Sequence, residues 1–144
     1  MTAVSVVETG KGGKMGNSDE KNKSVLITGG TGKFYYVYND DAFIINYLLG
    51  YKILPKLKLG FPDSALNKVI FHLQSFHISY KVIKSNKVID EKNYKKINNY
   101  SKYSMLSKKN ADIERRIENI FVKIKLLDKD RLIHVIDQIE ECLE

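Results

Sequence analysis

The sequence predicts an α/β (α+β) protein in which a small β-sheet packs with helices and is followed by a C-terminal helical hairpin. Between residues 25 and 90, short segments rich in β-branched and aromatic residues alternate with segments whose apolar residues recur at helical spacing. After residue 110 only the helical spacing recurs. The composition, 43% apolar and 28% charged, is that of an ordinary folded protein. We therefore expect one α/β domain with an appended helical segment.

Composition divides the chain into four segments. Residues 1–24 combine Gly, Ser, Asn and charged residues with few bulky apolar ones, which predicts a flexible N-terminal arm. Residues 25–90 hold the predicted α/β domain. Residues 91–109 are rich in Lys, Asn, Ser and Tyr and show no clear period, which predicts a basic linker or long loop with some local helix. Residues 110–144 hold the predicted hairpin.

The α/β domain begins with two predicted strands, Val25–Ile27 and Phe34–Tyr38. The glycine-rich turn "TGGTG" between them allows the two strands to pair. Asn39 or Asp40 can cap the helix that follows, and Gly50 can end it. The sequence therefore predicts a strand, a turn, a strand and a helix in that order.

The second half of the domain contains three more predicted strands and one helix. A strand covers Tyr51–Leu54, and a loop, Pro55–Gly60, follows it. The helix is predicted to begin near Pro62 or Asp63, because a proline costs little in the first turn. The last two strands, Ser79–Ile83 and Lys87–Asp90, are close enough in sequence to form a hairpin.

Two helices are predicted after the basic segment, over Ala111–Leu127 and Lys129–Leu143. A short polar turn separates them, so we expect an antiparallel hairpin. Each helix carries its apolar residues on one face: Ile113, Ile117, Ile120, Phe121, Ile124 and Leu127 in the first, and Leu132, Ile136, Ile139 and Leu143 in the second. These faces could cover the sheet, pair two copies of the chain or dock a protein partner.

The glycines before the second strand do not make a nucleotide site. Measured from the Gly32-Lys33 pair, a phosphate-binding loop needs a glycine where Ile27 stands and a hydroxyl where Phe34 stands. A dinucleotide-binding motif needs its third glycine where Tyr35 stands, and a helix should follow in place of a strand. We therefore expect a turn here and no bound nucleotide.

Other catalytic and metal-binding patterns are also missing from the sequence. The single cysteine, Cys142, excludes an internal disulfide or a multi-cysteine zinc site. His72, His77 and His134 lack the spacing of metal ligands. The longest apolar run, residues 42–51, is too short to cross a bilayer, and no signal-peptide pattern begins the sequence. We expect a cytoplasmic protein that is not an enzyme, binds no cofactor or metal and contacts no membrane.

The positive charge is concentrated in one part of the chain. The formal net charge is +7, and residues 81–109 alone carry +7, from nine lysines against Asp90 and Glu91. A concentrated cationic segment attracts polyanions such as nucleic acid. A solvated lysine-rich loop explains the same charge equally well.

The segment from Gly32 to Ile53 resembles the start of the N-terminal mismatch-recognition domain of the DNA mismatch repair protein MutS. A second segment, from Gly60 to Ile83, is similar to the next block of that domain. The matching residues of the first block are Gly32, Phe34, Tyr35, Asp40, Asp41 and Ala42, and those of the second are Gly60, Pro62, Ala65, Leu73 and Ser79. The resemblance covers roughly Val25 to Ile89 and implies a mixed sheet packed with helices.

In the MutS family this domain enters the DNA minor groove with a Phe-x-Glu motif. The phenylalanine, which stacks on the mispaired base, corresponds to Phe34. The glutamate, which hydrogen-bonds to that base, corresponds to Tyr36, and a tyrosine supplies no carboxylate. An aromatic ring can still be inserted between bases without the glutamate, because this insertion requires only the ring. The chain lacks the ATPase, clamp and lever segments of the family.

The resemblance and the charge together predict a free-standing, non-catalytic DNA-binding domain. Lysines would contact phosphate, Phe34 is a candidate wedge, and a core position for the aromatic strand residues is the alternative. The predicted DNA-contacting residues are Lys33, Phe34, Tyr36, Lys56, Lys58, Lys92, Lys95, Lys96 and Lys102. A protein-interaction or oligomerisation module that has lost DNA contact is the other candidate function.

Overall fold

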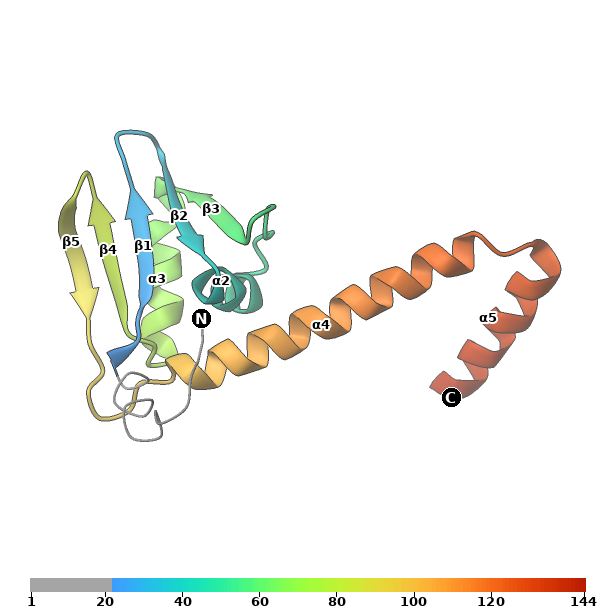
Figure 1. Cartoon of the computed structure of the whole chain (residues 1–144). Coiled ribbons are helices and arrows are strands. Elements are labelled where there is room, and N and C mark those ends of the chain that lie inside the picture. Colours follow the sequence, from blue (N-terminus) through green and yellow to red (C-terminus); the bar gives the residue numbers. More distant parts are fainter. Residues whose placement is uncertain (1–21) are drawn as a thin grey trace, which may run out of the picture. The chain divides into compact units, whose positions relative to one another are not determined.

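The computed structural model describes residues 22–144, and nearly all of the predicted N-terminal arm lies outside them. The chain divides into two compact units after Lys108. The first contains a five-stranded sheet with helices, and the second contains two helical segments joined by a turn (Figure 1). This arrangement confirms the predicted α/β class with a C-terminal helical hairpin.

The sheet has the strand order β3-β2-β1-β4-β5 (Figure 1). β1 pairs in parallel with β4, whereas the other neighbours are antiparallel, so the sheet is mixed. The strands are β1 (Val25–Gly29), β2 (Phe34–Tyr38), β3 (Lys58–Pro62), β4 (Tyr80–Lys84) and β5 (Lys87–Lys92). β4 and β5 form the predicted hairpin, in which Ser85 and Asn86 take the positive φ angles of a tight two-residue turn.

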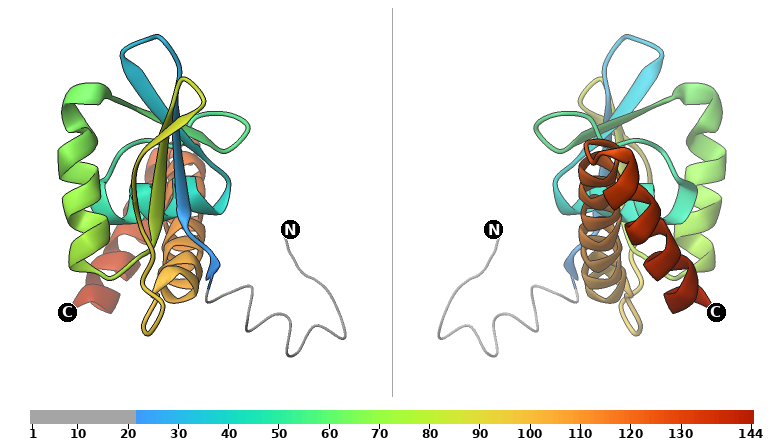
Figure 2. Two further views of the ribbon diagram at one scale, coloured as in Figure 1. Left: turned by 90° about the vertical axis from the view of Figure 1, so that its left-hand side faces the viewer. Right: turned by 90° about the vertical axis from the view of Figure 1, so that its right-hand side faces the viewer.

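Two helices, α2 (Asp40–Leu49) and α3 (Leu66–Ser75), pack into one core with the sheet. Figure 2 shows α3 running along one side of the sheet. Gly50 ends α2 in the left-handed conformation, as expected, and a 3-10 turn η1 (Asp63–Ala65) precedes α3. The core takes alternate residues from the strands: Val25, Ile27, Tyr35, Val37, Leu59, Phe61, Tyr80 and Val82.

The third strand differs from the prediction. Tyr51–Leu54 form no strand apart from an isolated bridge between Leu54 and Lys58, and β3 begins at Lys58 inside the predicted loop. Gly60 and Pro62 lowered the strand signal of this segment. Both are tolerated here, because β3 is an edge strand and Pro62 stands at its end.

The predicted linker contains more helix than expected, because residues 100–109 are helical throughout. They begin α4 (Tyr100–Lys125), which continues without a break through the first predicted hairpin helix. Tyr100, Ser104 and Ser107 are buried on one side of its first turns. The small serines let the helix approach the α/β domain closely, but their polarity hid the helical period from the sequence.

In the second unit, residues 109–144, α4 ends at Lys125 and α5 (Lys129–Leu143) follows with the predicted bounds. The Asp128 side chain accepts a hydrogen bond from the Arg131 N–H at 3.0 Å and so caps α5. No residue of this unit is fully buried. Along residues 22–144, none of the helices has the length and apolarity needed to span a membrane.

Candidate nucleic-acid interface

A row of three aromatic side chains, Phe34, Tyr36 and Tyr38, lies on the face of the sheet opposite the core. Their neighbours in β2, Tyr35 and Val37, are buried at 3% and 0% exposure. Phe34 and Tyr38 are 49% and 44% exposed, and Tyr36 is half-buried. The strand alternation therefore sends Phe34 away from the core, which answers the question that the sequence left open. We call these three residues the aromatic row.

Tyr36 lies against the backbone of the edge strand. Tyr36 pairs with Gly60 across β2 and β3, and a Cβ placed on Gly60 would be 2.7 Å from Tyr36 Cε1. The Phe34 and Tyr36 rings are stacked, with their centroids 6.3 Å apart and an interplanar angle of 26°. The glycine thus leaves room for an aromatic ring on the surface of the sheet.

A lysine completes this cluster. The Lys58 Nζ lies 4.2 Å from the centroid of the Tyr36 ring, within the range of a cation–π contact. Lys58 pairs with Tyr38 across the strands, so it stands on the same face as the aromatic row. Ring stacking and a positive charge are combined here within two neighbouring strands.

Two further predicted lysines flank the aromatic row at its two ends. Lys33 is exposed in the turn that leads into Phe34, and its carbonyl accepts a hydrogen bond from the Asp63 N–H at 2.7 Å. Lys56 is exposed in the turn before β3, where it has a φ of 66°. The next residue, Leu57, is tied to the Tyr38 end of β2 because its carbonyl accepts from the Asn39 N–H at 2.8 Å.

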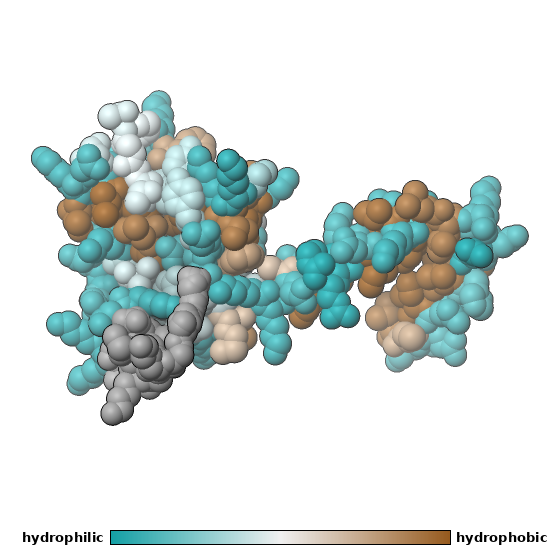
Figure 3. Space-filling model, viewed as in Figure 1, coloured by the Kyte–Doolittle hydropathy of each residue, from teal (hydrophilic) through white to brown (hydrophobic). Residues whose placement is uncertain are grey.

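The rest of this open face is mixed in character. Leu26 is 41% exposed on β1, and Ile83 is half-buried on β4. Lys81 Nζ lies 4.0 Å from a Glu91 carboxylate oxygen on β5, so part of its charge is compensated. Figure 3 shows apolar and polar residues side by side on the sheet. The β2–β3 side therefore holds both the aromatic row and its lysines.

The other predicted lysines do not join this cluster. Lys92 ends the edge strand β5, whereas the aromatic row and Lys58 lie on β2 and on β3, the edge strand on the other side of the sheet. The remaining predicted lysines follow in the chain: Lys95 and Lys96 between β5 and α4, and Lys102 in α4. The structure therefore separates the predicted set into two groups, one at the β3 edge of the sheet and one at or after the opposite edge strand, β5.

The second group carries tyrosines of its own. Lys92 Nζ lies 5.7 Å from the Tyr94 ring, and Lys102 Nζ lies 5.6 Å from the Tyr103 ring. Tyr103 packs against Tyr47 and Phe76, with ring centroids 6.3 Å and 5.3 Å away. These rings are engaged with the α/β domain and present less free surface than the aromatic row does.

Tyr100 has a structural role. Its hydroxyl donates a 2.5 Å hydrogen bond to Asp41, whose other carboxylate oxygen accepts from the Leu26 N–H at 3.0 Å. Burial raises the pKa of Asp41 to about 6, against the effect of the two hydrogen bonds. Burial also raises the pKa of Tyr100, and the Asp41 charge adds to that shift. Asp41 thus joins α2, β1 and α4, and does more than complement the dipole of α2.

An ion pair strengthens the same junction. Lys108 Nζ lies 2.8 Å from Asp40 Oδ1, and the Ser104 hydroxyl donates to the other Asp40 oxygen at 3.4 Å. Asp40 and Asp41 therefore hold the first turns of α4 in place. Lys108 is thereby committed to a carboxylate and is not available as a free phosphate ligand.

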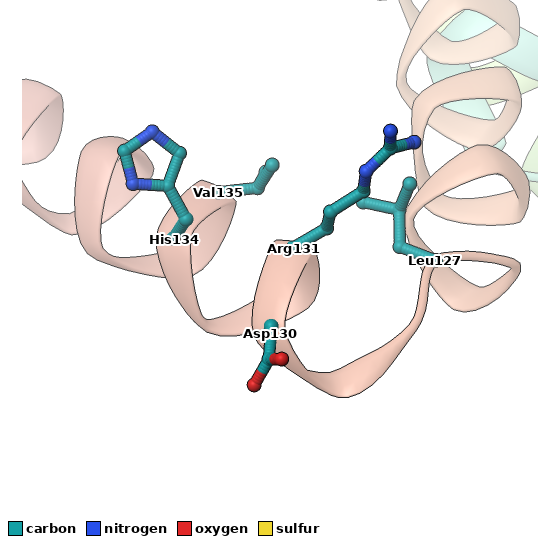
Figure 4. Close-up of a pocket in the computed structure, with 5 residues that line it drawn as sticks. All are labelled: Leu127, Asp130, Arg131, His134 and Val135. Carbon is teal, nitrogen blue, oxygen red and sulfur yellow. The ribbon is translucent and has the colours of Figure 1, made fainter.

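Within residues 22–144, no three His, Cys, Asp or Glu side chains gather as a metal site. One open pocket of about 440 Å³ lies at the turn between α4 and α5 (Figure 4). It is lined mainly by apolar atoms of Leu127, Asp130, Arg131, His134 and Val135. His134 and Asp130 are on the same helix, and Figure 4 shows no converging set of polar groups. We assign no chemistry to this pocket.

Sequence reasoning missed Tyr38 as a member of the site. The family resemblance selects Phe34 and Tyr36 alone, whereas the strand alternation also places Tyr38 on their face. Its cross-strand neighbour could not be found, because β3 was predicted as a loop.

Comparison of the chain with models of known protein families gives no match, and comparison with curated proteins gives none either.

Proposed function

We propose that this protein binds DNA without catalysing a reaction, and that the aromatic row and its lysines make the contact. The observation that supports this most is the exposure of Phe34 and Tyr38 on an open sheet face, with Lys58 beside them. A folded protein rarely leaves a row of aromatic rings in water unless the surface has a partner. Stacking on bases together with lysine contacts to phosphates fits this surface.

The spacing of the row agrees with this proposal. Alternate residues of a strand are about 7 Å apart, which is about twice the 3.4 Å rise of successive bases in one DNA strand. The rings can therefore contact bases that are unstacked or spread apart, as in distorted DNA. Tyr36 offers a hydroxyl in place of the carboxylate that the MutS family uses, so we expect stacking with little discrimination between mispairs.

The test is an equilibrium binding measurement with labelled DNA at two salt concentrations. Matched, mismatched, branched and single-stranded DNA of equal length are compared, and we expect salt-dependent binding with preference for the distorted or unpaired forms. Phe34→Ala should weaken binding by about tenfold, since a base–aromatic stack contributes about 1–3 kcal/mol. Phe71→Ala is the matched control, because Phe71 is 65% exposed on α3. Absence of salt-dependent binding to every DNA would refute the proposal.

A protein-interaction module remains the second candidate. It is favoured by the large exposed apolar residues of α4 and α5, such as Ile113, Ile117 and Ile136. Figure 3 shows hydrophobic residues on both of these helices. The same binding experiment separates the two functions. A pure interaction module would not bind DNA, and Phe34→Ala would leave its partner binding unchanged.

A further inference from the structure

Phe34 and Tyr36 form a ring pair at the start of the aromatic row. Their planes are close to parallel, with an interplanar angle of 26°, and their centroids are 6.3 Å apart. This is nearly the full separation of alternate residues in a strand, about 7 Å, so the rings are not drawn together into contact. Successive bases in a DNA strand stack about 3.4 Å apart, so three stacked rings place the outer two about 6.8 Å apart. The ring pair therefore has the spacing of two rings with a third ring between them.

The residues beside the ring pair are small. On β3, Gly60 stands opposite Tyr36, and the position of a Cβ on this glycine is 3.7 Å from Phe34 Cδ2. Both rings therefore lie along the same glycine. On β1, Thr28 pairs with Tyr36, and its hydroxyl donates to the Tyr36 carbonyl at 3.4 Å. Gly30, in the turn after β1, has open space where a side chain would be.

Lys58 approaches Tyr36 from the side opposite to Phe34. It pairs with Tyr38, which stands two residues after Tyr36 on β2, whereas Phe34 stands two residues before Tyr36. The Lys58 Nζ that lies 4.2 Å from the centroid of the Tyr36 ring therefore comes from the Tyr38 side. One face of the Tyr36 ring is thus in contact with a cation, and the other is directed toward Phe34.

We propose that one unpaired base of the bound DNA inserts between the rings of Phe34 and Tyr36 and contacts both. This base site rests on the proposed function and lies on the same surface, but it holds one base between two rings in place of one base on one ring. A stacking site accepts any base, because every base has a π-face. The ligand is therefore an unpaired or extruded base of DNA, of any sequence.

The lysines beside the ring pair fit the rest of that nucleotide. Lys33 directly precedes Phe34, and the Lys58 Nζ lies against Tyr36. A nucleotide within a strand has one phosphate on each side of its sugar, so a base between two rings brings one phosphate toward each end of the ring pair. A matched duplex should be a weaker ligand, because its base must first leave the stack.

A wedge in the minor groove makes a different prediction from insertion. A wedge places one ring against a base that stays in the duplex, and Phe34 alone can supply that ring. Insertion of a base needs both rings, so the loss of either ring should have the same kind of effect. Tyr36 is therefore the residue that distinguishes the two modes of binding.

The first experiment measures the affinity of the full chain for two DNA duplexes that differ at one position. One carries a single unpaired thymine in the middle of one strand, and the other carries an abasic residue at that point. We expect the wild type to bind the thymine duplex about tenfold more tightly or better, since base–aromatic stacks strengthen binding by about that factor. Phe34→Ala and Tyr36→Ala should each lower this ratio severalfold. Tyr38→Ala is the matched control and should keep the wild-type ratio, because Tyr38 is 44% exposed on the same face but lies outside the ring pair.

The ratio also separates this proposal from the proposed function. Each variant is compared on two DNAs, so a partial loss of folded protein lowers both affinities alike. Equal affinities of the wild type for the two duplexes overturn the base site and leave the proposed function standing, whereas no binding to any DNA refutes both. An unchanged ratio in Tyr36→Ala, or an equal fall in Tyr38→Ala, also overturns the base site.

The second experiment observes the inserted base by NMR. The methyl group of the unpaired thymine gives a resolved proton signal, and protons above the face of an aromatic ring are shifted upfield. We expect an upfield shift when the wild type binds, and Phe34→Ala and Tyr36→Ala should each remove part of it. A shift that Phe34→Ala alone reduces would mean contact with one ring and would overturn the insertion.

Discussion

The ring of Tyr36 occupies the space that a side chain at Gly60 would need. The two residues pair across β2 and β3, and Tyr36 Cε1 lies 2.7 Å from the position of a Cβ on Gly60. Gly60 has an ordinary backbone conformation for a strand, because its φ is not among the positive values of the chain. Position 60 therefore requires a glycine because any larger side chain would collide with the Tyr36 ring, and not because the backbone needs a conformation that only glycine adopts.

Replacing Gly60 by alanine should move the Tyr36 ring and weaken DNA binding. A contact of 2.7 Å is too short for any real Cβ, so the ring must turn away and lose its stack with Phe34. We expect a several-fold loss of affinity with a destabilisation of about 1 kcal/mol or less, because Tyr36 is half-buried. DNA titrations of Gly60→Ala, Tyr36→Ala and the double variant check this. Equal losses in the second and third variants would show that Gly60 acts through Tyr36.

Lys58 should contribute one phosphate contact. We expect Lys58→Gln to weaken binding to all DNA forms alike, because a phosphate contact carries no sequence information. The slope of log affinity against log salt should fall by about one. Lys95→Gln is the matched control from the second lysine group and should change the slope less. An equal change in both variants would mean that both edges of the sheet touch DNA.

Most of the fold could be predicted because local patterns were clear. The aromatic and β-branched residues of β2 predicted a strand, but the period of two left open which face points to the core, and the structure shows Phe34 exposed and Tyr35 buried. β3 was missed because Gly60 and Pro62 are residues that usually interrupt strands. In the structure the Tyr36 ring fills the space over Gly60, and Pro62 is tolerated because β3 is an edge strand. Both reasons depend on the tertiary structure and leave no local signal.

The start of α4 shows the same limit for a helix. Tyr100, Ser104 and Ser107 have the spacing of a buried helical face, but two of the three are polar and the segment is rich in lysine. The helix is held there by bonds to residues far away in sequence, above all the 2.5 Å bond from Tyr100 to Asp41. The predicted site was divided for a related reason, since the sequence gives no distance between the linker lysines and β2.

Removing the Tyr100 hydroxyl should loosen the junction of α4 with the α/β domain. In Tyr100→Phe, Asp41 loses a hydrogen bond in a largely buried position, and the expected loss in the free energy of unfolding is about 1–3 kcal/mol. The pKa of Asp41 should rise above about 6, because the Tyr100 bond lowers it at present. Urea unfolding and NMR titration of the carboxyl group measure the two effects. Tyr94→Phe serves as the control, and an unchanged stability of Tyr100→Phe would contradict the assigned role.

Stability should fall as the pH rises through the titration of Asp41. Burial raises its pKa from 3.8 to about 6 in the folded protein, so folding favours the protonated carboxyl. This contribution to stability is fully present below pH 3.8, decreases above it and is gone above about pH 6. Its full size is at most about 3 kcal/mol, since one pKa unit corresponds to about 1.4 kcal/mol.

Urea unfolding of the wild type and of Asp41→Asn between pH 4 and 7 isolates the effect, because other groups titrate in both proteins. The wild type should lose stability relative to the variant over this range, whereas Asp137→Asn, at an exposed acid of α5, should follow the wild type. A constant difference between the wild type and Asp41→Asn would show that Asp41 titrates alike in the folded and unfolded chain.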